Sequence, residues 1–418
     1  MAGNKITKFR KNKLAVYSAR FILVMIVVAL LADILANEKP IICRYKGNIY
    51  FPVFRSYLVD ATILTWPSDF QNAEWTLLSY DWVLFPPVPY LPQNIDKNNM
   101  HSVSPFAKQK ISSSHWKHWM GTDELGHDVL SAMIHGTRIA LLVGLVSMSI
   151  AGFIGIVLGS LAGYYGDQRL KITRAEALIN PVFLFLALFY AFGTRNYVLK
   201  DALSISFSHF LIQLFISLLI IITVLFTGYK ISKLAGKLSF LKNKVNIPTD
   251  LIISRFIEVM ISIPTLFLII SIVAIAKPSL LLVMTIIGLT TWTGIARFIR
   301  AELLRIRSLE YIEAAHALGY SERRIIVRHA IPNALSAVLI AIAFGIASAI
   351  LIESTLSFLG IGVPPETLTW GSLLSEARQS PSAWWMAVFP GLAIFLTISV
   401  YNLVGEGLSD GLDPKLRK

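Results

Sequence analysis

Long apolar runs recur along the chain and predict membrane-spanning helices. A helix needs about 20 apolar residues to cross the hydrocarbon core of a bilayer. We expect eight spans, and their approximate bounds are residues 21–36, 137–164, 175–192, 203–227, 251–275, 280–296, 333–352 and 385–404. The second span contains Gly144 and a series of glycines three or four residues apart, from Gly152 to Gly163, which would let it approach its neighbours closely.

The positions of the cations set the predicted orientation. Six Lys or Arg and no acidic residue occur in the first twenty positions, which favours a cytoplasmic N-terminus. A cleaved signal peptide is the alternative, but Glu38-Lys39-Pro40 makes a poor cleavage site, so we expect a retained helix. The span at 175–192 is the weakest because it is short and contains Asn180-Pro181. With eight spans the arginine-rich loop after residue 297 also lies inside, as do both termini.

One segment of about a hundred residues, 37–136, contains no run long enough to span. This segment contains eight Lys or Arg and nine Asp or Glu, and tryptophans and prolines are frequent in it. Long loops cross the membrane regardless of their charge, so neutrality supports the side assignment only weakly. We expect an extracytoplasmic loop or a small cap.

Composition excludes several classes of protein. Hydrophobic residues make up 55% of the chain and charged residues 15%, against about 25% charged in soluble domains. An integral membrane protein remains, and its net charge of +13 reflects basic cytoplasmic loops rather than a nucleic-acid partner. The single cysteine, Cys43, excludes an intrachain disulfide and a zinc site of several thiolates.

The sequence contains none of the common phosphate-binding, metalloprotease or serine-hydrolase motifs. The chain has no phosphate-binding Gly-x-x-x-x-Gly-Lys-Ser/Thr loop and no metalloprotease or serine-hydrolase signature. Four histidines in or beside the long segment could be imagined as a metal site, but a polar segment near the membrane is the simpler interpretation; they are His115, His118, His127 and His135. The acidic residues Asp33, Glu258 and Glu406 lie near the ends of apolar runs, unlike the mid-membrane groups of ion-driven carriers. We therefore expect a chain that is not an enzyme and binds no metal or cofactor.

The loop around Gly319 is the most informative. Residues 309–318 predict a helix that Gly319 ends in a left-handed cap, and Ser321 would cap a second short helix that Pro332 closes. Small residues at the tip of such a helix–turn–helix suit docking into a groove on a partner. A surface loop anchored to lipid headgroups by arginines is an equally good interpretation of the residues alone.

A resemblance decides between these interpretations. Glu313-Ala-Ala-x3-Gly319-x9-His329-x-Ile331-Pro332 resembles the Glu-Ala-Ala loop of ABC-transporter permeases in binding-protein-dependent importers, and Arg-His before x-Pro-Asn is common in the peptide/nickel branch. The resemblance implies that the loop couples the permease to its ATPase. The implied coupling residues are Glu313, Ala314, Ala315, Gly319, His329, Pro332 and Asn333.

Other stretches resemble the second permease subunit of that branch. They are Gly121-Thr-Asp-Glu-Leu-Gly-His-Asp128 (with His127 in the usual place of an arginine), Ser357-Phe-Leu-Gly-Ile-Gly-Val-Pro-Pro365, Thr369-Trp-Gly371 and Gly407-Leu-Ser-Asp-Gly-Leu-Asp-Pro414. Asn37-Glu-Lys-Pro and Tyr50-Phe-Pro-Val-Phe54 further resemble the microcin C permease subgroup. The implied fold is an all-α integral membrane protein, a helical bundle of the type I ABC importer permease kind.

The chain departs from the family by an insertion of about 80 residues. Its two spans preserve the orientation of the six family helices, and an accessory element or a surface insertion without a role are equally good interpretations. The predicted organisation is a cytoplasmic N-terminus and first helix (1–36), the extracytoplasmic loop or cap (37–136), a transmembrane helix (137–166), the inserted hairpin with a basic cytoplasmic tail (167–249), and the core permease domain (250–418) with its coupling loop (297–332).

The resemblance also implies partners. A homologous second permease, ABC ATPase subunits that bind the ATP, and an extracytoplasmic solute-binding protein would assemble with this chain in the inner membrane. Peptides or peptide-like compounds are the expected substrates, and nickel or another chelated metal is the alternative. A stand-alone secondary carrier and a membrane-embedded enzyme are the rival classes.

Overall fold

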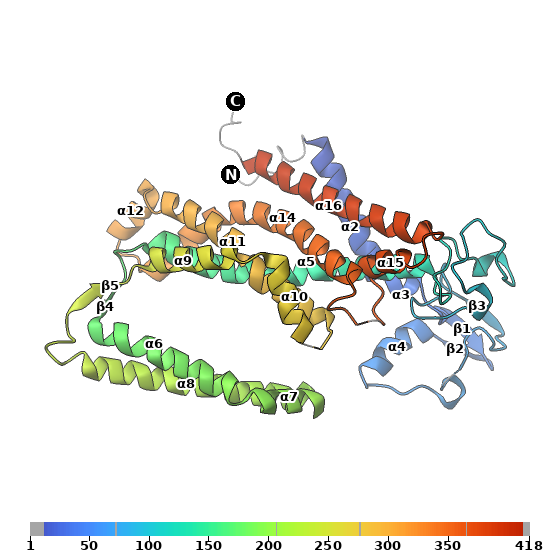
Figure 1. Cartoon of the computed structure of the whole chain (residues 1–418), viewed down its shortest axis with the longest axis horizontal. Coiled ribbons are helices and arrows are strands. Elements are labelled where there is room, and N and C mark those ends of the chain that lie inside the picture. The colour runs from blue at the N-terminus through green and yellow to red at the C-terminus, as the bar shows by residue number, and fades with distance from the viewer. Residues whose placement is uncertain (1–11, 72, 206, 276, 365, 413–418) are drawn as a thin grey trace. The chain divides into compact units, whose positions relative to one another are not determined.

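The chain forms two compact units in a computed structural model that describes residues 12–71, 73–205, 207–275, 277–364 and 366–412. Unit 1 comprises Met1–Ser160 and Ile257–Lys418, and unit 2 comprises Leu161–Phe256. Helices dominate both units (Figure 1). Within the described residues, seven helices are long and apolar enough to cross a membrane, or up to eight if a bent pair counts as one span. This agrees with the predicted polytopic helical bundle.

Five long helices build the bundle of unit 1. They are α2 (Lys13–Leu30), α5 (Val129–Ser160), α11 (Leu280–Ile306), α14 (Ile331–Phe358) and α16 (Trp385–Leu412). Helix α5 packs against both α11 and α14, and α16 packs against α2 and α14. The two ends of the described chain lie side by side, since the Asn12 amide donates to the Asp410 carboxylate at 3.3 Å. Both ends of the described chain therefore lie at the same end of the bundle, as a placement of both termini on one side of the membrane would require.

Glycines on α5 allow the close approach that their spacing predicts. A Cβ atom added at Gly155 would lie 2.8 Å from the Cβ of Ile295, and one at Gly159 would lie 2.6 Å from the carbonyl oxygen of Ala296. Both distances are too short for a real side chain, so α5 and α11 meet backbone to backbone. The Ser147 hydroxyl adds a hydrogen bond of 2.9 Å to the Met284 carbonyl on α11.

The predicted span at residues 251–275 is not one straight helix. The structure divides it into α9 (Thr249–Ser262) and α10 (Thr265–Ile275), which meet at an angle of 77°. Pro264 lies at the break. Its ring removes a backbone donor and disfavours helical geometry at Ile263, which accounts for the bend.

An acidic residue lies deeper in the bundle than the sequence indicates. The predicted span ends at residue 352, but α14 continues to Phe358 and buries the Glu353 side chain, which is 1% exposed. The Ser357 hydroxyl donates to its carboxylate at 2.6 Å. The following helix α15 (Trp370–Ala377) returns against this turn, because a Cβ at Gly371 would lie 2.4 Å from the Ser354 carbonyl oxygen.

Residues 37–128, here called the head, fold into a small domain-like element joined to α2 by α3 (Ala32–Leu35). Its elements are β1 (Ile42–Tyr45), β2 (Asn48–Tyr50), α4 (Pro52–Asp60), η1 (Ser68–Phe70), β3 (Trp82–Leu84), η2 (Lys97–Asn99) and η3 (Ser114–Trp116). The strands form an antiparallel sheet in the order β2-β1-β3, with Cys43 paired to Tyr50 and Val83. Stacked aromatic rings, such as Phe70 on Trp75 at 5.1 Å, supply its apolar interior. The head is thus a folded cap rather than an open loop.

Unit 2 is an antiparallel helical hairpin with a two-stranded base. It consists of η4 (Leu161–Tyr165), β4 (Lys171–Thr173), α6 (Arg174–Leu188), η5 (Phe189–Gly193), α7 (Asn196–Ile205), α8 (Phe207–Ala235), β5 (Lys244–Asn246) and the start of α9. The stretch between its two predicted spans is largely helical, because a π turn at η5 leads from α6 toward α7. Strand β4 pairs with β5 and brings the two ends of the hairpin together.

Candidate functional site

The helix–turn–helix predicted around Gly319 is present and is here called the turn segment (residues 309–333). Helix α12 (Glu310–Ala317) is followed by its C-cap Leu318 and then by Gly319, whose φ of +73° is a left-handed conformation that glycine adopts without strain. The Gly319 amide donates to the His316 carbonyl at 2.9 Å, and the Tyr320 amide donates to the Ala315 carbonyl at 3.2 Å. These two bonds form a Schellman cap, which confirms the predicted glycine turn.

The two faces of α12 differ in exposure. Ile312 and Ala315 are buried, together with Ile325 on the second short helix α13 (Glu322–Ile325). Glu313, Ala314 and Gly319 are exposed, and the adjacent Leu318 is 72% exposed. The predicted coupling residues therefore divide into an outward group (Glu313, Ala314, Gly319) and the inward Ala315, which packs inside the segment.

Side-chain contacts fix the rest of the turn segment. His316 Nδ1 lies 3.6 Å from Glu322 Oε1 across the turn. The Tyr320 ring stacks on His329 with a centroid distance of 6.2 Å, and the Arg324 guanidinium lies 4.3 Å from the centre of the same ring.

Asn333 ties the end of the segment to its beginning. Its amide donates to the His329 carbonyl at 2.7 Å and to the Tyr311 hydroxyl at 3.3 Å. The predicted residues His329 and Asn333 thus hold the shape of the segment. The contacts of Tyr311 with Asn333 and of Tyr320 with His329 could not be predicted from the residue pattern, because these partners are 22 and nine residues apart along the chain.

Two predicted details of the turn segment differ in the structure. Ser321 lies at the N-cap position of α13 as predicted, but its side chain makes no capping hydrogen bond there. Pro332 does not close the second helix, because α13 continues through a π turn, η6 (Ile326–Ala330), directly into α14. In a regular α-helix the Pro332 ring would collide with the carbonyl of residue 328, and the wider π turn relieves that conflict. The turn segment is therefore continuous with a long helix of the bundle.

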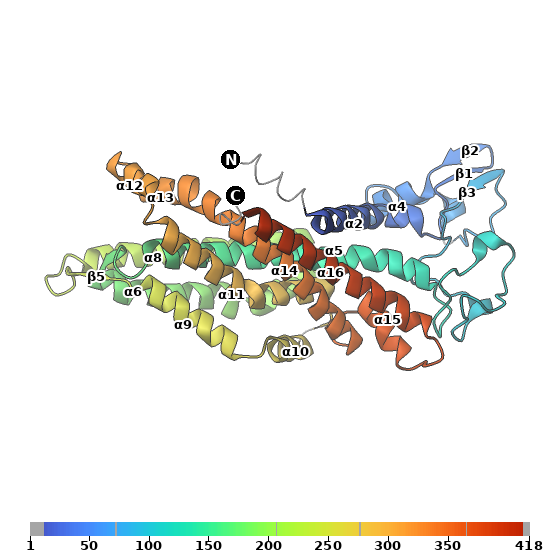
Figure 2. The same ribbon diagram turned by 90° about the horizontal axis from the view of Figure 1, so that it is seen from above.

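The turn segment and the head lie at opposite ends of unit 1 (Figures 1 and 2). Helix α11 leads to α12, and η6 leads back into α14, so two bundle helices hold the segment at its ends. A force applied to the exposed face of α12 would act on both helices. This arrangement is suited to passing a movement from a partner into the bundle.

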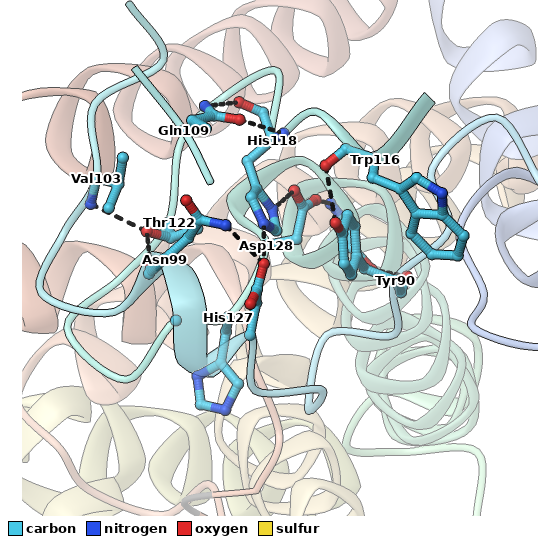
Figure 3. Close-up of polar contacts among 12 residues, drawn as sticks. Tyr90, Asn99, Val103, Gln109, Trp116, His118, Thr122, His127 and Asp128 are labelled. Atoms are coloured by element: carbon cyan, nitrogen blue, oxygen red, sulfur yellow. Dashed lines mark hydrogen bonds and ion pairs between the residues drawn. The ribbon is translucent and has the colours of Figure 1, made fainter. Parts of the chain in front are cut away.

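A hydrogen-bonded network joins the head to the first turn of α5 (Figure 3). The Thr122 hydroxyl donates to the Asn99 carbonyl at 2.7 Å, and its own carbonyl accepts from the Trp385 indole at 3.1 Å. Asp128 immediately precedes α5 and accepts from the Ser131 amide at 2.6 Å, as a helix-capping carboxylate does. The stretch from Gly121 to Asp128 thus anchors the head to the bundle.

His118 is the centre of this network. Its side chain is 0% exposed, and its Nδ1 and Nε2 atoms lie 2.8 Å from Asp128 and 3.2 Å from Asp96. Burial alone would lower the pKa of His118, but the hydrogen bonds with Asp128 and Asp96 outweigh it and raise the pKa. The ring also stacks on Tyr90 with a centroid distance of 4.3 Å.

His127, which stands where the resembling permeases have arginine, makes a second ion pair. Its Nδ1 atom lies 2.6 Å from the Asp123 carboxylate. Burial, with the nearby Asp123 carboxylate, raises the pKa of Glu376 on α15 to about 7.

Among the described residues no three His, Cys, Asp or Glu side chains are arranged to hold a metal ion. His118 and His127 instead bond to carboxylates, and His135 Nε2 donates to the Ala36 carbonyl, 2.9 Å away.

Comparison with known protein families also indicates a transport permease. Residues 231–418 match the model of the "binding-protein-dependent transport system inner membrane component" family, and residues 6–48 match that of the "N-terminal TM domain of oligopeptide transport permease C". The chain is 29% identical over 412 residues (97% of its length and 95% of the relative) to the inner membrane ABC transporter permease protein YejE of Escherichia coli (strain K12).

Two further relatives carry names that include a transported compound. The peptidoglycan transport system permease protein YejE of Agrobacterium fabrum is 26% identical over 429 residues, which cover 97% of this chain and 91% of the relative. The oligopeptide transport system permease protein OppC of Haemophilus influenzae is 37% identical over 203 residues, which cover 48% of this chain and 64% of the relative.

Proposed function

Through residues 6–48 and 231–418 the chain belongs to the inner-membrane components of binding-protein-dependent transport systems, and from this premise we propose that it imports peptides or peptide-like compounds. The chain is a multi-pass membrane permease and a transport subunit rather than an enzyme. The names of its relatives, which include oligopeptide, dipeptide and peptidoglycan transport permeases, support the substrate class. Nickel or another chelated metal is the alternative cargo.

The turn segment is the proposed site of coupling to a separate ATPase, which would bind the ATP. The observation that supports this role is the outward group Glu313, Ala314 and Gly319 with the 72% exposed Leu318 beside it. A small, rigid tip that exposes an apolar side chain is suited to a groove on another protein. Closure of the ATPase subunits would push α12 and thereby move α11 and α14, which exchanges inward for outward access.

The proposed assembly also contains a homologous second permease and a solute-binding protein that delivers the cargo. In this arrangement both termini and the turn segment face the cytoplasm, and the head faces the opposite side. The inner membrane is the corresponding location. The substrate pathway would lie between the two permeases.

A pull-down of the tagged chain from mild detergent, with mass spectrometry of the co-purifying proteins, tests the proposal. We expect a second permease and one or two ATPases, with a binding protein as the handle for identifying the substrate. A chain that is isolated alone under conditions that preserve other ABC complexes would contradict the proposal and favour a stand-alone carrier.

A further inference from the structure

A cleft of about 840 Å³ opens in the head. It lies within the size range of clefts that bind small molecules. Residues from three stretches of the head line it, at 74–77, 89–98 and 110–116, together with Glu38. All of them belong to unit 1.

Charges of both signs line the cleft and do not neutralise each other. Besides Asp96, which is bonded to His118, Glu38 and Glu74 provide carboxylates, and Lys97 and Lys110 provide ammonium groups. Glu74, Lys97 and Lys110 are exposed, and the interactions found among the described residues include no ion pair between these four side chains. The cleft therefore offers opposite charges to a ligand that carries both an ammonium and a carboxylate.

Apolar groups complete the lining. Leu77 is 76% exposed and Ile95 is 51% exposed, although both belong to a folded element outside the long helices. The Trp116 side chain lies in the same lining and is half-buried. A ligand with an apolar body between its charges would cover these side chains.

The wall of the cleft is held in place before a ligand arrives. Asn99 is 1% exposed and donates to the Asp96 carboxylate at 2.7 Å and to the Lys110 carbonyl at 3.1 Å. The side-chain oxygen of Asn99 accepts a hydrogen bond from the Lys110 backbone amide at 2.8 Å. These bonds join two stretches of the lining, so a ligand need not order them and binding costs less.

From this lining we propose that the head cleft binds a short zwitterionic peptide. Glu74 and Glu38 receive its ammonium group, Lys97 and Lys110 receive its carboxylate, and Leu77 and Ile95 contact its apolar side chain. The inference rests on the proposed peptide substrates and adds a binding site on the permease itself, outside the helical bundle. Asp96, which lines the cleft, also bonds to His118. The bound ligand would therefore be separated from the network at the start of α5 by this one residue.

Photo-crosslinking of the full-length chain, purified in lipid nanodiscs with its co-purifying subunits, tests this site. The probe is alanyl-benzoylphenylalanyl-alanine, and the control probe is the same peptide with an acetylated N-terminus and an amidated C-terminus. We expect adducts in residues 74–77, 95–98 and 110–116 with the zwitterion, and about threefold to fivefold fewer with the blocked peptide, the scale expected for exposed ion pairs. Equal labelling by the two probes, or adducts confined to the long helices, would overturn the proposal.

Matched variants separate the cleft from the general charge of the head. Glu74→Gln and Lys97→Gln should each reduce labelling, whereas Asp60→Asn and Lys108→Gln, which are exposed residues of the head outside the lining, should not. If the cleft variants weaken only the association with a solute-binding protein, the cleft is a protein-docking surface and the peptide site is disproved. Co-purification of ATPases with an unlabelled cleft would refute this inference alone, and a labelled cleft without ATPases would refute the proposed import function instead.

Discussion

The head and the turn segment, at opposite ends of unit 1, place their charges differently (Figure 2). In the head, the His118 side chain is fully buried between the carboxylates of Asp128 and Asp96. In the turn segment the buried side chains are apolar, and charged ones such as Glu313 and Arg323 lie at the surface. The shape of the head therefore depends on internal electrostatics. The turn segment depends on backbone bonds, apolar packing and surface contacts such as that of His316 with Glu322.

The largest expected effect is the loss of stability of the head in the His118→Ala variant. The variant leaves the Asp128 carboxylate buried without its cationic partner, and breaking a buried pair in this way costs about 3–5 kcal/mol of unfolding free energy. Thermal unfolding of the purified chain, followed by tryptophan fluorescence, measures the loss. His115→Ala is the matched control, because His115 is exposed and only three residues away. Equal losses in the two variants would show that the charge network does not hold the head.

The pH dependence of the head should follow the raised pKa of His118. A group with a raised pKa stabilises the folded state fully below its unfolded pKa of about 6.5, and this stabilisation is lost as the pH rises through the folded pKa. The stability difference between the native chain and His118→Asn should therefore shrink as the pH rises above about 6.5. His127 and Glu376 remain in both proteins, so their titration largely cancels. A difference that grows with pH would contradict the assignment.

The same contrast explains what could be predicted from the sequence. The turn segment is local: its cap, its glycine and its helix lie within a dozen residues, and Gly319 carries the conformational signal itself. The network around His118 is not local, because Asp96 lies 22 residues earlier and the Tyr90 ring 28 residues earlier. From the sequence alone, His118 is therefore only one of several polar residues near the membrane.

Helix positions were predictable from apolar run length, whereas helix ends and breaks were not. Pro332 was expected to end a helix, but a π turn accommodates it, and no residue pattern distinguishes these outcomes. Glu353 was missed because the apolar run ends just before it. Its burial depends on the return of α15 over the end of α14, which is a tertiary contact. The 77° bend lies at Pro264, a residue that the apolar run includes within a single predicted span.

At the turn segment, Gly319→Val should cost little stability and abolish transport. No atom lies within 4 Å of a Cβ added at Gly319, so the fold loses only about 1 kcal/mol from the left-handed backbone. Gly360→Val is the matched control, because Gly360 has the same φ of +73° and equally open surroundings at the other end of α14. Uptake assays with both variants at equal membrane levels should show a loss for Gly319→Val only. Normal uptake by Gly319→Val would refute the coupling role.

The smallest expected change in stability is that of Leu318→Ala. Its side chain is 72% exposed, so the unfolding free energy should change by no more than about 0.5 kcal/mol. If Leu318 fills a groove on the ATPase, transport and co-purification of the ATPase should both fall severalfold, as for a truncated apolar anchor at an interface. Ile49→Ala is the control, because Ile49 is 66% exposed on β2 of the head. Equal uptake by the two variants would mean that the partner does not cover Leu318, and that the exposed tip acts through Glu313 and the backbone shape alone.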